Sequence, residues 1–142
     1  MQLFISYAQK DIGLASTLSE RLSREGLKVW SANDKIHPGD NWATKIGQAL
    51  DESDLMLVLL TPGAMESDWL RQEIEFAIGS RKYEGRVFAI FVGSSADMGK
   101  DMPWILRKLR YFHVESAKEL GMVAKEIALS LRTNPNVSKA NA

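Results

Sequence analysis

The sequence predicts an α/β fold in which a parallel sheet of five strands is flanked by helices. Short apolar segments rich in strand-forming residues alternate with longer segments whose apolar residues have helical spacing. Such alternation is typical of consecutive β-α-β units, which build a parallel sheet through right-handed crossovers. The third apolar segment, Leu55–Leu60, is apolar on both faces, as a central strand buried between two helical layers should be. We therefore predict a flavodoxin-like, doubly wound sheet.

The elements follow one another in a regular order. The apolar segments that predict strands are Leu3–Tyr7, Leu27–Trp30, Leu55–Leu60, Val87–Val92 and Leu109–Val114. The segments that predict helices are Ile12–Glu25, Trp42–Asp51, Trp69–Lys82 and Leu120–Leu131. Gly26 suits the end of the first helix, and Ser67 suits the N-cap of the third. In such a sheet, ligands bind at the carboxyl ends of the strands.

The length of the chain indicates one domain with one core. It has 142 residues, and helical periodicity ends near Leu131. We predict a domain over residues 1–132. The polar residues 133–142 are predicted to be a disordered tail or a linker.

Composition excludes several kinds of function. Basic and acidic residues number 18 each, so no nucleic-acid or membrane partner is indicated. The absence of cysteine excludes disulfides and thiolate metal sites, and the two histidines lack metal-ligand spacing, so no metal is predicted. The N-terminal residues have neither the basic nor the long apolar segment of a signal peptide, and we expect a cytoplasmic protein.

Two kinds of nucleotide-binding site that are common in this architecture are excluded, because their glycine motifs are absent from the sequence. The turn after the first strand, Ser6–Asp11, contains no glycine, so it is not a dinucleotide-binding fingerprint. The sequence also contains no phosphate-binding P-loop.

Four segments, taken in order, carry a resemblance to one family. They are Phe4–Ala8 followed by Asp11, Val29–Trp30 with Ile36–Trp42, Ser53–Pro62, and Ser67–Glu73. In this order and at this spacing, the chain resembles a bacterial-type TIR (Toll/interleukin-1 receptor) domain from about residue 2 to about residue 131. Pro103-Trp104 resembles a variant of the third box of this family.

The resemblance implies an enzyme that cleaves NAD⁺, because catalytic members carry a glutamate four residues after a tryptophan. Here these residues are Glu73 and Trp69. The implied activity is that of an NAD⁺ glycohydrolase or ADP-ribosyl cyclase, which in bacteria serves antiphage defence. NAD⁺ is then the substrate, and no separate cofactor is implied. The alternative is a non-catalytic TIR module that binds other TIR domains, as an adaptor or as a virulence factor mimicking one.

The position of Glu73 on its helix suits the proposed chemistry. The core stripe of this helix is predicted to consist of Leu70, Ile74, Ala77 and Ile78. Glu73 falls at the edge of the stripe, next to Trp69. A carboxylate there would stabilise the positive charge that builds on a ribose as nicotinamide leaves. The competing interpretation is a solvated carboxylate paired with Arg71 or Lys45.

Other residues are candidate substrate contacts by their place in the family motifs. They are Ser6, Tyr7, Asp11, Trp30, Ser67 and Trp69. Trp30 could equally be a core aromatic residue. Asp11 is better explained as an N-cap of the first helix, and Ser67 could be only a cap.

One loop is predicted to mediate assembly, because the family uses it to complete the site of a neighbouring subunit. Its residues are Pro38, Gly39, Asp40, Asn41 and Trp42. The resemblance thus implies homotypic TIR–TIR contacts, and head-to-tail contacts of this kind form open filaments. Trp42 is better explained as an anchor of the following helix than as a stacking partner for adenine. A sensor or effector domain, fused or associated, is a further expected partner.

Overall fold

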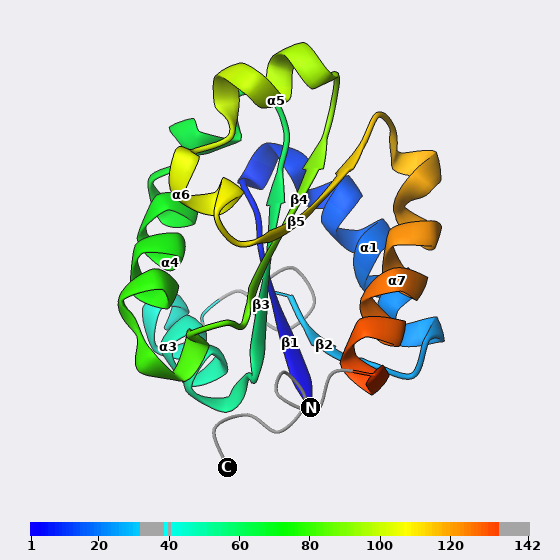
Figure 1. Ribbon diagram of the computed structural model, residues 1–142. Coiled ribbons are helices and arrows are strands. Elements are labelled where there is room, and N and C mark those ends of the chain that lie inside the picture. The colour runs from blue at the N-terminus through cyan, green and yellow to red at the C-terminus, as the bar shows by residue number, and fades with distance from the viewer. Residues whose placement is uncertain (32–38, 40, 134–142) are drawn as a thin grey trace.

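The fold is a parallel sheet covered by helices on both faces (Figure 1). The computed structural model describes residues 1–31, 39 and 41–133. Its strands are β1 (Gln2–Ser6), β2 (Lys28–Trp30), β3 (Leu55–Leu60), β4 (Val87–Val92) and β5 (Arg110–Val114). All neighbouring strands pair in parallel, in the order β2-β1-β3-β4-β5. The predicted five-stranded, doubly wound sheet is confirmed.

Helices cover the two faces of the sheet unequally (Figure 1). One face packs against α1 (Ile12–Arg24) and α7 (Leu120–Thr133). The other packs against α3 (Trp42–Glu52), α4 (Asp68–Gly79) and α6 (Trp104–Arg107), with α5 (Ser95–Asp101) beyond the carboxyl ends of the strands. Short 3-10 turns occupy Gln9–Asp11, Ala64–Glu66, Arg81–Tyr83 and Ala117–Glu119. Within the described ranges, no helix has the length and apolar character needed to cross a membrane.

Alternation along β1 decides which side chains face which helical layer. Leu3 and Ile5 lie in the core between the sheet and α1 and α7. Phe4 lies in the opposite core, between the sheet and α3 and α4. Because side chains two residues apart in a strand share a face, Ser6 points to the same side as Phe4, toward α4. A hydroxyl group is thereby placed inside an otherwise apolar layer.

Two local predictions about helix ends are confirmed. Gly26, just after α1, has a φ angle of 85°, which a residue without a side chain adopts at little cost. The hydroxyl of Ser67 accepts a hydrogen bond from the backbone N–H of Leu70 at 3.3 Å, so Ser67 caps α4. This cap begins α4 at the carboxyl end of the sheet, where a ligand would bind.

Tyr83 ties the turn before β4 to the end of α3. Its side chain is buried, and its hydroxyl donates a hydrogen bond of 2.5 Å to the carbonyl of Leu50. Replacing Tyr83 with Phe removes this hydrogen bond from the buried carbonyl of Leu50. We expect Tyr83→Phe to lower the free energy of unfolding by about 1–2 kcal/mol.

Urea unfolding followed by circular dichroism measures this loss. The matched control is Tyr111→Phe, because Tyr111 is 42% exposed on β5. If both variants unfold at the same urea concentration as the parent chain, the hydrogen bond of Tyr83 contributes nothing to stability.

Candidate active site

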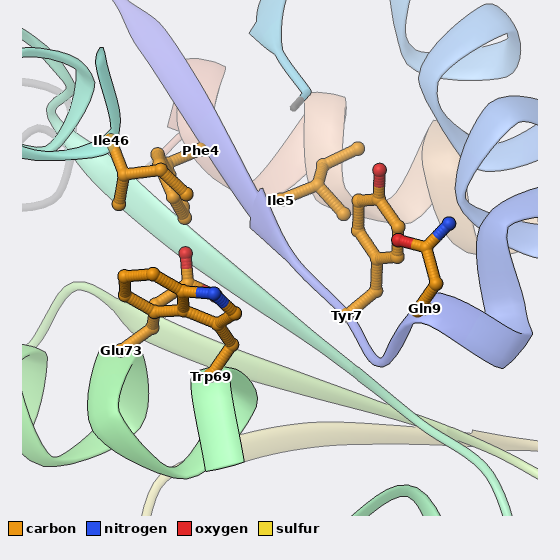
Figure 2. Close-up of a pocket in the computed structure, with 7 residues that line it drawn as sticks. All are labelled: Phe4, Ile5, Tyr7, Gln9, Ile46, Trp69 and Glu73. Atoms are coloured by element: carbon orange, nitrogen blue, oxygen red, sulfur yellow. The ribbon is translucent and has the colours of Figure 1, made fainter. Parts of the chain in front are cut away.

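A cavity opens where β1, α3 and α4 meet (Figure 2). Its volume is about 60 Å³, and it is lined by Phe4, Ile5, Tyr7, Gln9, Ile46, Trp69 and Glu73. A wider groove of about 430 Å³ runs beside it between α3 and α4. The two hollows share Ile46, Trp69 and Glu73. Glu73 therefore lies where the smaller cavity meets the wider groove.

The topology explains why the cavity forms here. The chain leaves β1 through α1 on one face of the sheet and reaches β3 through α3 on the other. β1 and β3 are neighbours, so the direction of winding changes between them. Doubly wound sheets leave a crevice at such a switch point. The side chains around this crevice are candidates for function on position alone.

Glu73 belongs to the buried face of α4. The buried residues of this helix are Leu70, Glu73, Ile74 and Ala77, which share one face at helical spacing. Glu73 is only 7% exposed, whereas Ile78 is 41% exposed. Glu73 lies at the edge of the buried stripe next to Trp69, as predicted, but it is buried there, whereas the prediction that Ile78 lies within the stripe is wrong. On α4, Glu73 faces Ser6 of β1, and Ile78 lies on the opposite side of the buried face, toward solvent.

A hydrogen bond holds the carboxyl group of Glu73. The hydroxyl of Ser6 donates to Oε1 of Glu73 at 2.8 Å, and both side chains are buried. Burial raises the pKa of Glu73 from its ordinary value of 4.5 to about 7, although the hydrogen bond from Ser6 opposes part of this rise. A carboxyl group that titrates near neutrality inside a cavity is a mark of functional sites.

The interpretation of Glu73 as a solvated, ion-paired carboxylate is contradicted. Arg71 pairs with Asp68 and also donates to the carbonyl of Met65. Within the described residues, Glu73 forms no ion pair with Arg71 or with Lys45. The cost of burying the ionised carboxylate is therefore not offset by an ion pair with either cation.

Trp69 forms one wall of the cavity. Figure 2 shows its indole ring beside the carboxyl group of Glu73, one helical turn away on α4. Phe4 and Ile46 lie across from these two side chains, and Tyr7 lies farther along the chain from β1. Trp69 is 40% exposed, which leaves part of its surface accessible to a ligand.

Four of the six predicted contacts, namely Ser6, Asp11, Trp30 and Ser67, lie outside the lining of the cavity. Trp30 stacks on Phe4 with ring centroids 5.0 Å apart and planes inclined by 9°, so it supports the cavity wall from behind. Of its two interpretations, this arrangement favours the packed aromatic residue. Ser67 is occupied as the cap of α4. Ser6 reaches the site through Glu73 rather than through the lining itself.

Asp11 does not cap the first helix as predicted. It occupies the N-cap position of α1, but its side chain makes no capping hydrogen bond. The carboxylate accepts a hydrogen bond of 2.6 Å from the hydroxyl of Thr61 and one of 3.3 Å from the ammonium group of Lys10. The cap prediction is wrong because Thr61, at the end of the adjacent strand, offers a donor that local sequence does not reveal.

Several lining residues were missed, and only some had a signal in the sequence. Phe4 shares a strand face with Ser6, so strict alternation could have identified it. Ile46 and Gln9 had no such signal, because their approach depends on how α3 and the turn after β1 pack. Within the described residues, no group of three or more potential metal ligands occurs.

The predicted assembly loop is only partly described. Pro38 and Asp40 lie outside the described residues. Gly39 has a φ angle of 93°, and the side chain of Asn41 accepts a hydrogen bond from the N–H of Thr44 at 3.1 Å, which caps α3. Trp42 begins α3.

Removing the hydroxyl of Ser6 tests the electrostatics of the site. We expect Ser6→Ala to raise the pKa of Glu73 further above 7, because the carboxylate loses a hydrogen bond that favours its charged form. Carboxyl ¹³C chemical shifts followed against pH report this value directly. Ser16→Ala, at an exposed position of α1, should leave the titration unchanged. An unchanged or lowered pKa in Ser6→Ala would contradict the role given to the hydroxyl.

Comparisons with known proteins agree on one family. The sequence profile described as TIR domain matches residues 3–126. A relative from Brachypodium distachyon, named "Probable 2' cyclic ADP-D-ribose synthase BdTIR", is 28% identical over 83 residues. That match covers 57% of this chain and 37% of the relative, so the chain spans well under half of that protein.

Solved structures share the fold. The TIR domain of the Toll-related receptor TRR-2 from Hydra magnipapillata superposes with a TM-score of 0.72 and 17% identity, over 92% of this chain and 98% of that one. A metazoan TIR-STING receptor from C. gigas, solved in complex with 2′,3′-cGAMP, gives a TM-score of 0.72 and 20% identity, over 89% of this chain and 39% of that one. With the family profile matching most of the chain, the protein belongs to the TIR domain family.

Proposed function

We propose that this TIR domain cleaves the bond between nicotinamide and ribose in NAD⁺, with Glu73 as its catalytic residue. The observation that carries the proposal is a carboxyl group, buried at the junction of a cavity and a groove, that is held by Ser6 and flanked by Trp69. The name of the Brachypodium relative, a probable synthase of a cyclic ADP-ribose, supports an activity of this kind. An adaptor that only binds other TIR domains has no use for a buried, unpaired carboxyl group.

The chemistry requires one negative charge and little else. When the bond between ribose C1′ and the pyridinium nitrogen breaks, its electron pair goes to nitrogen and nicotinamide leaves neutral. Positive charge then develops on the ribose, and an ionised Glu73 stabilises it. Water or a hydroxyl group of the ADP-ribose moiety attacks C1′ and loses a proton, which gives a hydrolysed or a cyclised product.

The surroundings of Glu73 strengthen this stabilisation. Its side chain is 7% exposed, so little water screens the attraction between carboxylate and ribose. Ser6 fixes one carboxylate oxygen and leaves the other available to the ribose. The indole of Trp69 supplies an apolar wall beside Glu73, which limits the amount of water around the carboxylate.

The size of the cavity supports activation by assembly. A volume of about 60 Å³ is well below the roughly 300–1,000 Å³ typical of ligand pockets. The groove beside it adds room but is open to solvent on the lone domain. We propose that a neighbouring copy covers this groove and completes the substrate site. The antiphage role implied by the family resemblance remains a prediction.

Nicotinamide release from NAD⁺, separated by chromatography at several protein concentrations, tests the proposal. We expect release per molecule of protein to rise with concentration, because the site is completed by association. The accompanying product separates hydrolysis from cyclisation. If no nicotinamide is released at high concentration under molecular crowding, the proposal fails and the adaptor alternative gains support.

A further inference from the structure

The groove between α3 and α4 presents an apolar surface to solvent. Its volume is about 430 Å³, and its apolar lining includes Ile46, Leu50 and Phe76. Phe76 is 47% exposed, an unusual degree for a phenylalanine that lines a hollow. An exposed apolar hollow of this kind is typical of a surface that binds another macromolecule.

One end of this groove carries a negative charge. Asp51 lines the groove where α3 ends. Lys82 donates to the backbone carbonyl of Asp51, whereas the carboxylate forms no ion pair among the described residues. Phe76 packs edge-on against Tyr83, with ring centroids 6.4 Å apart, and burial together with Asp54 and Asp51 raises the pKa of the Tyr83 hydroxyl. A partner that fits this groove should combine an apolar side chain with a positive charge.

Such a pair of side chains lies on α6. Trp104 is 70% exposed, the most of any large apolar side chain in the described part of the chain. Lys108 follows four residues later, at the C-cap of the same helical turn, so the two side chains can share one side of it. Lys108 is exposed and forms no ion pair within the described ranges. Tryptophan is the kind of residue that anchors protein interfaces.

Trp104 is too far from the groove of its own domain to occupy it. α3 packs against β1, whereas α6 packs against β5, three strands away and thus about 14 Å across the sheet. α4 separates the two helices, because it lines the groove together with α3 and a smaller hollow together with α6. A contact between Trp104 and the groove must therefore join two copies of the chain.

We propose that Trp104 of one copy docks in the groove between α3 and α4 of the next copy, with Lys108 beside Asp51. This inference rests on the proposed function and adds to it the surface of the neighbouring copy that covers the site. The groove shares Trp69 and Glu73 with the cavity, so the docked copy closes the open side of the site. Because the two contact surfaces differ, the contact is head-to-tail and can repeat into a ring or an open filament.

The absence of cysteine from the chain allows a direct test by cross-linking. Gly47→Cys places a thiol in the groove, where an added Cβ meets no neighbouring atom within 4 Å, and Lys108→Cys places one beside Trp104. With a short bis-maleimide, a mixture of the two variants should give a mixed dimer. The variant carrying both substitutions should give a ladder of oligomers, and either single variant alone should give little dimer.

The matched control for the cross-link is Lys125→Cys, which places the thiol on the exposed side of α7. It should not cross-link to Gly47→Cys. Abundant symmetric dimers from either single variant would refute the head-to-tail contact. So would the absence of a mixed dimer at every protein concentration, which would indicate that another molecule or another part of the same chain covers the groove.

Removing the anchor tests the role of Trp104. Trp104→Ala, added to Lys108→Cys, should raise the protein concentration needed for half-maximal cross-linking roughly 30-fold, as the loss of an interface hot spot would. Met122→Ala is the control, because Met122 is 57% exposed on α7 and its shortening should leave the yield unchanged. Equal yields with and without the indole would exclude Trp104 as the anchor.

Mixing two inactive variants separates the inference from the proposed function. Trp104→Ala should release little nicotinamide at a concentration where the wild type is active, and addition of Glu73→Gln should restore release. The Glu73→Gln copy keeps Trp104 and covers the groove of a copy that keeps Glu73. If the wild type is active but the mixture is not, the inference fails and the proposed function stands. If the wild type releases no nicotinamide, the proposed function fails, and cross-linking alone decides the docking contact.

Discussion

Glu73→Gln is expected to reduce nicotinamide release by a factor on the order of 10³. The amide has the size of the carboxyl group and can still accept a hydrogen bond from Ser6, so the fold and the cavity should persist. It carries no negative charge, however, and cannot balance the positive charge that develops on the ribose. The loss should appear in kcat, because the charge exists only in the transition state.

The matched control is Glu75→Gln, since Glu75 lies on the same helix at an exposed position. Both variants make the same change in net charge, so only the place of the carboxyl group differs between them. Chromatographic assay at one protein concentration, chosen where the wild type is active, compares the three proteins. Activity that survives in Glu73→Gln would exclude Glu73 as the catalytic residue.

The second large effect concerns stability against pH. Burial raises the pKa of Glu73 to about 7, above its ordinary 4.5. A raised carboxyl pKa means that the folded state binds the proton more tightly than the unfolded state does. Below pH 4.5 the group is protonated in both states and costs nothing. As pH rises from 4.5 to 7, the unfolded chain releases this proton at a lower pH than the folded chain does. The free energy of unfolding therefore falls over this range.

Above pH 7 the difference amounts to about 3 kcal/mol, and Glu73→Gln should be more stable than the wild type by roughly this amount. Urea unfolding of both proteins at intervals from pH 4.5 to 8 measures the difference, in which the contributions of all other groups cancel. The two stabilities should converge toward pH 4.5. A difference independent of pH would show that Glu73 titrates with the same pKa in both states.

The sheet could be predicted closely because the residues of its buried central strands are all apolar. Leu55–Leu60 and Val87–Val92 are apolar throughout, and the structure gives the same bounds for β3 and β4. α5 and α6 were not predicted, since helices of 7 and 4 residues are too short to display an apolar period.

The candidate site could be located from sequence but not assembled from it. Spacing alone brought Trp69 and Glu73 together, because four residues make one helical turn. The hydrogen-bond partner of the buried Glu73 is Ser6, which is 67 residues away in sequence. The partner of Asp11 is likewise 50 residues away. Local rules about caps and stripes contain no information on such contacts, and these are the places where the predictions were wrong.

Because Glu73 titrates near neutrality, ligand binding beside it should release protons that the buffer takes up. With a pKa of about 7, its carboxyl group is close to half protonated in neutral solution. A pyridinium ring seated beside it favours the ionised form, so each substrate molecule that binds at neutral pH displaces up to about half a proton. The heat of binding must then include the heat with which the buffer takes up that proton. Titrations of Glu73→Gln with a non-hydrolysable pyridinium analogue in phosphate and in Tris should agree, while those of the parent domain should not.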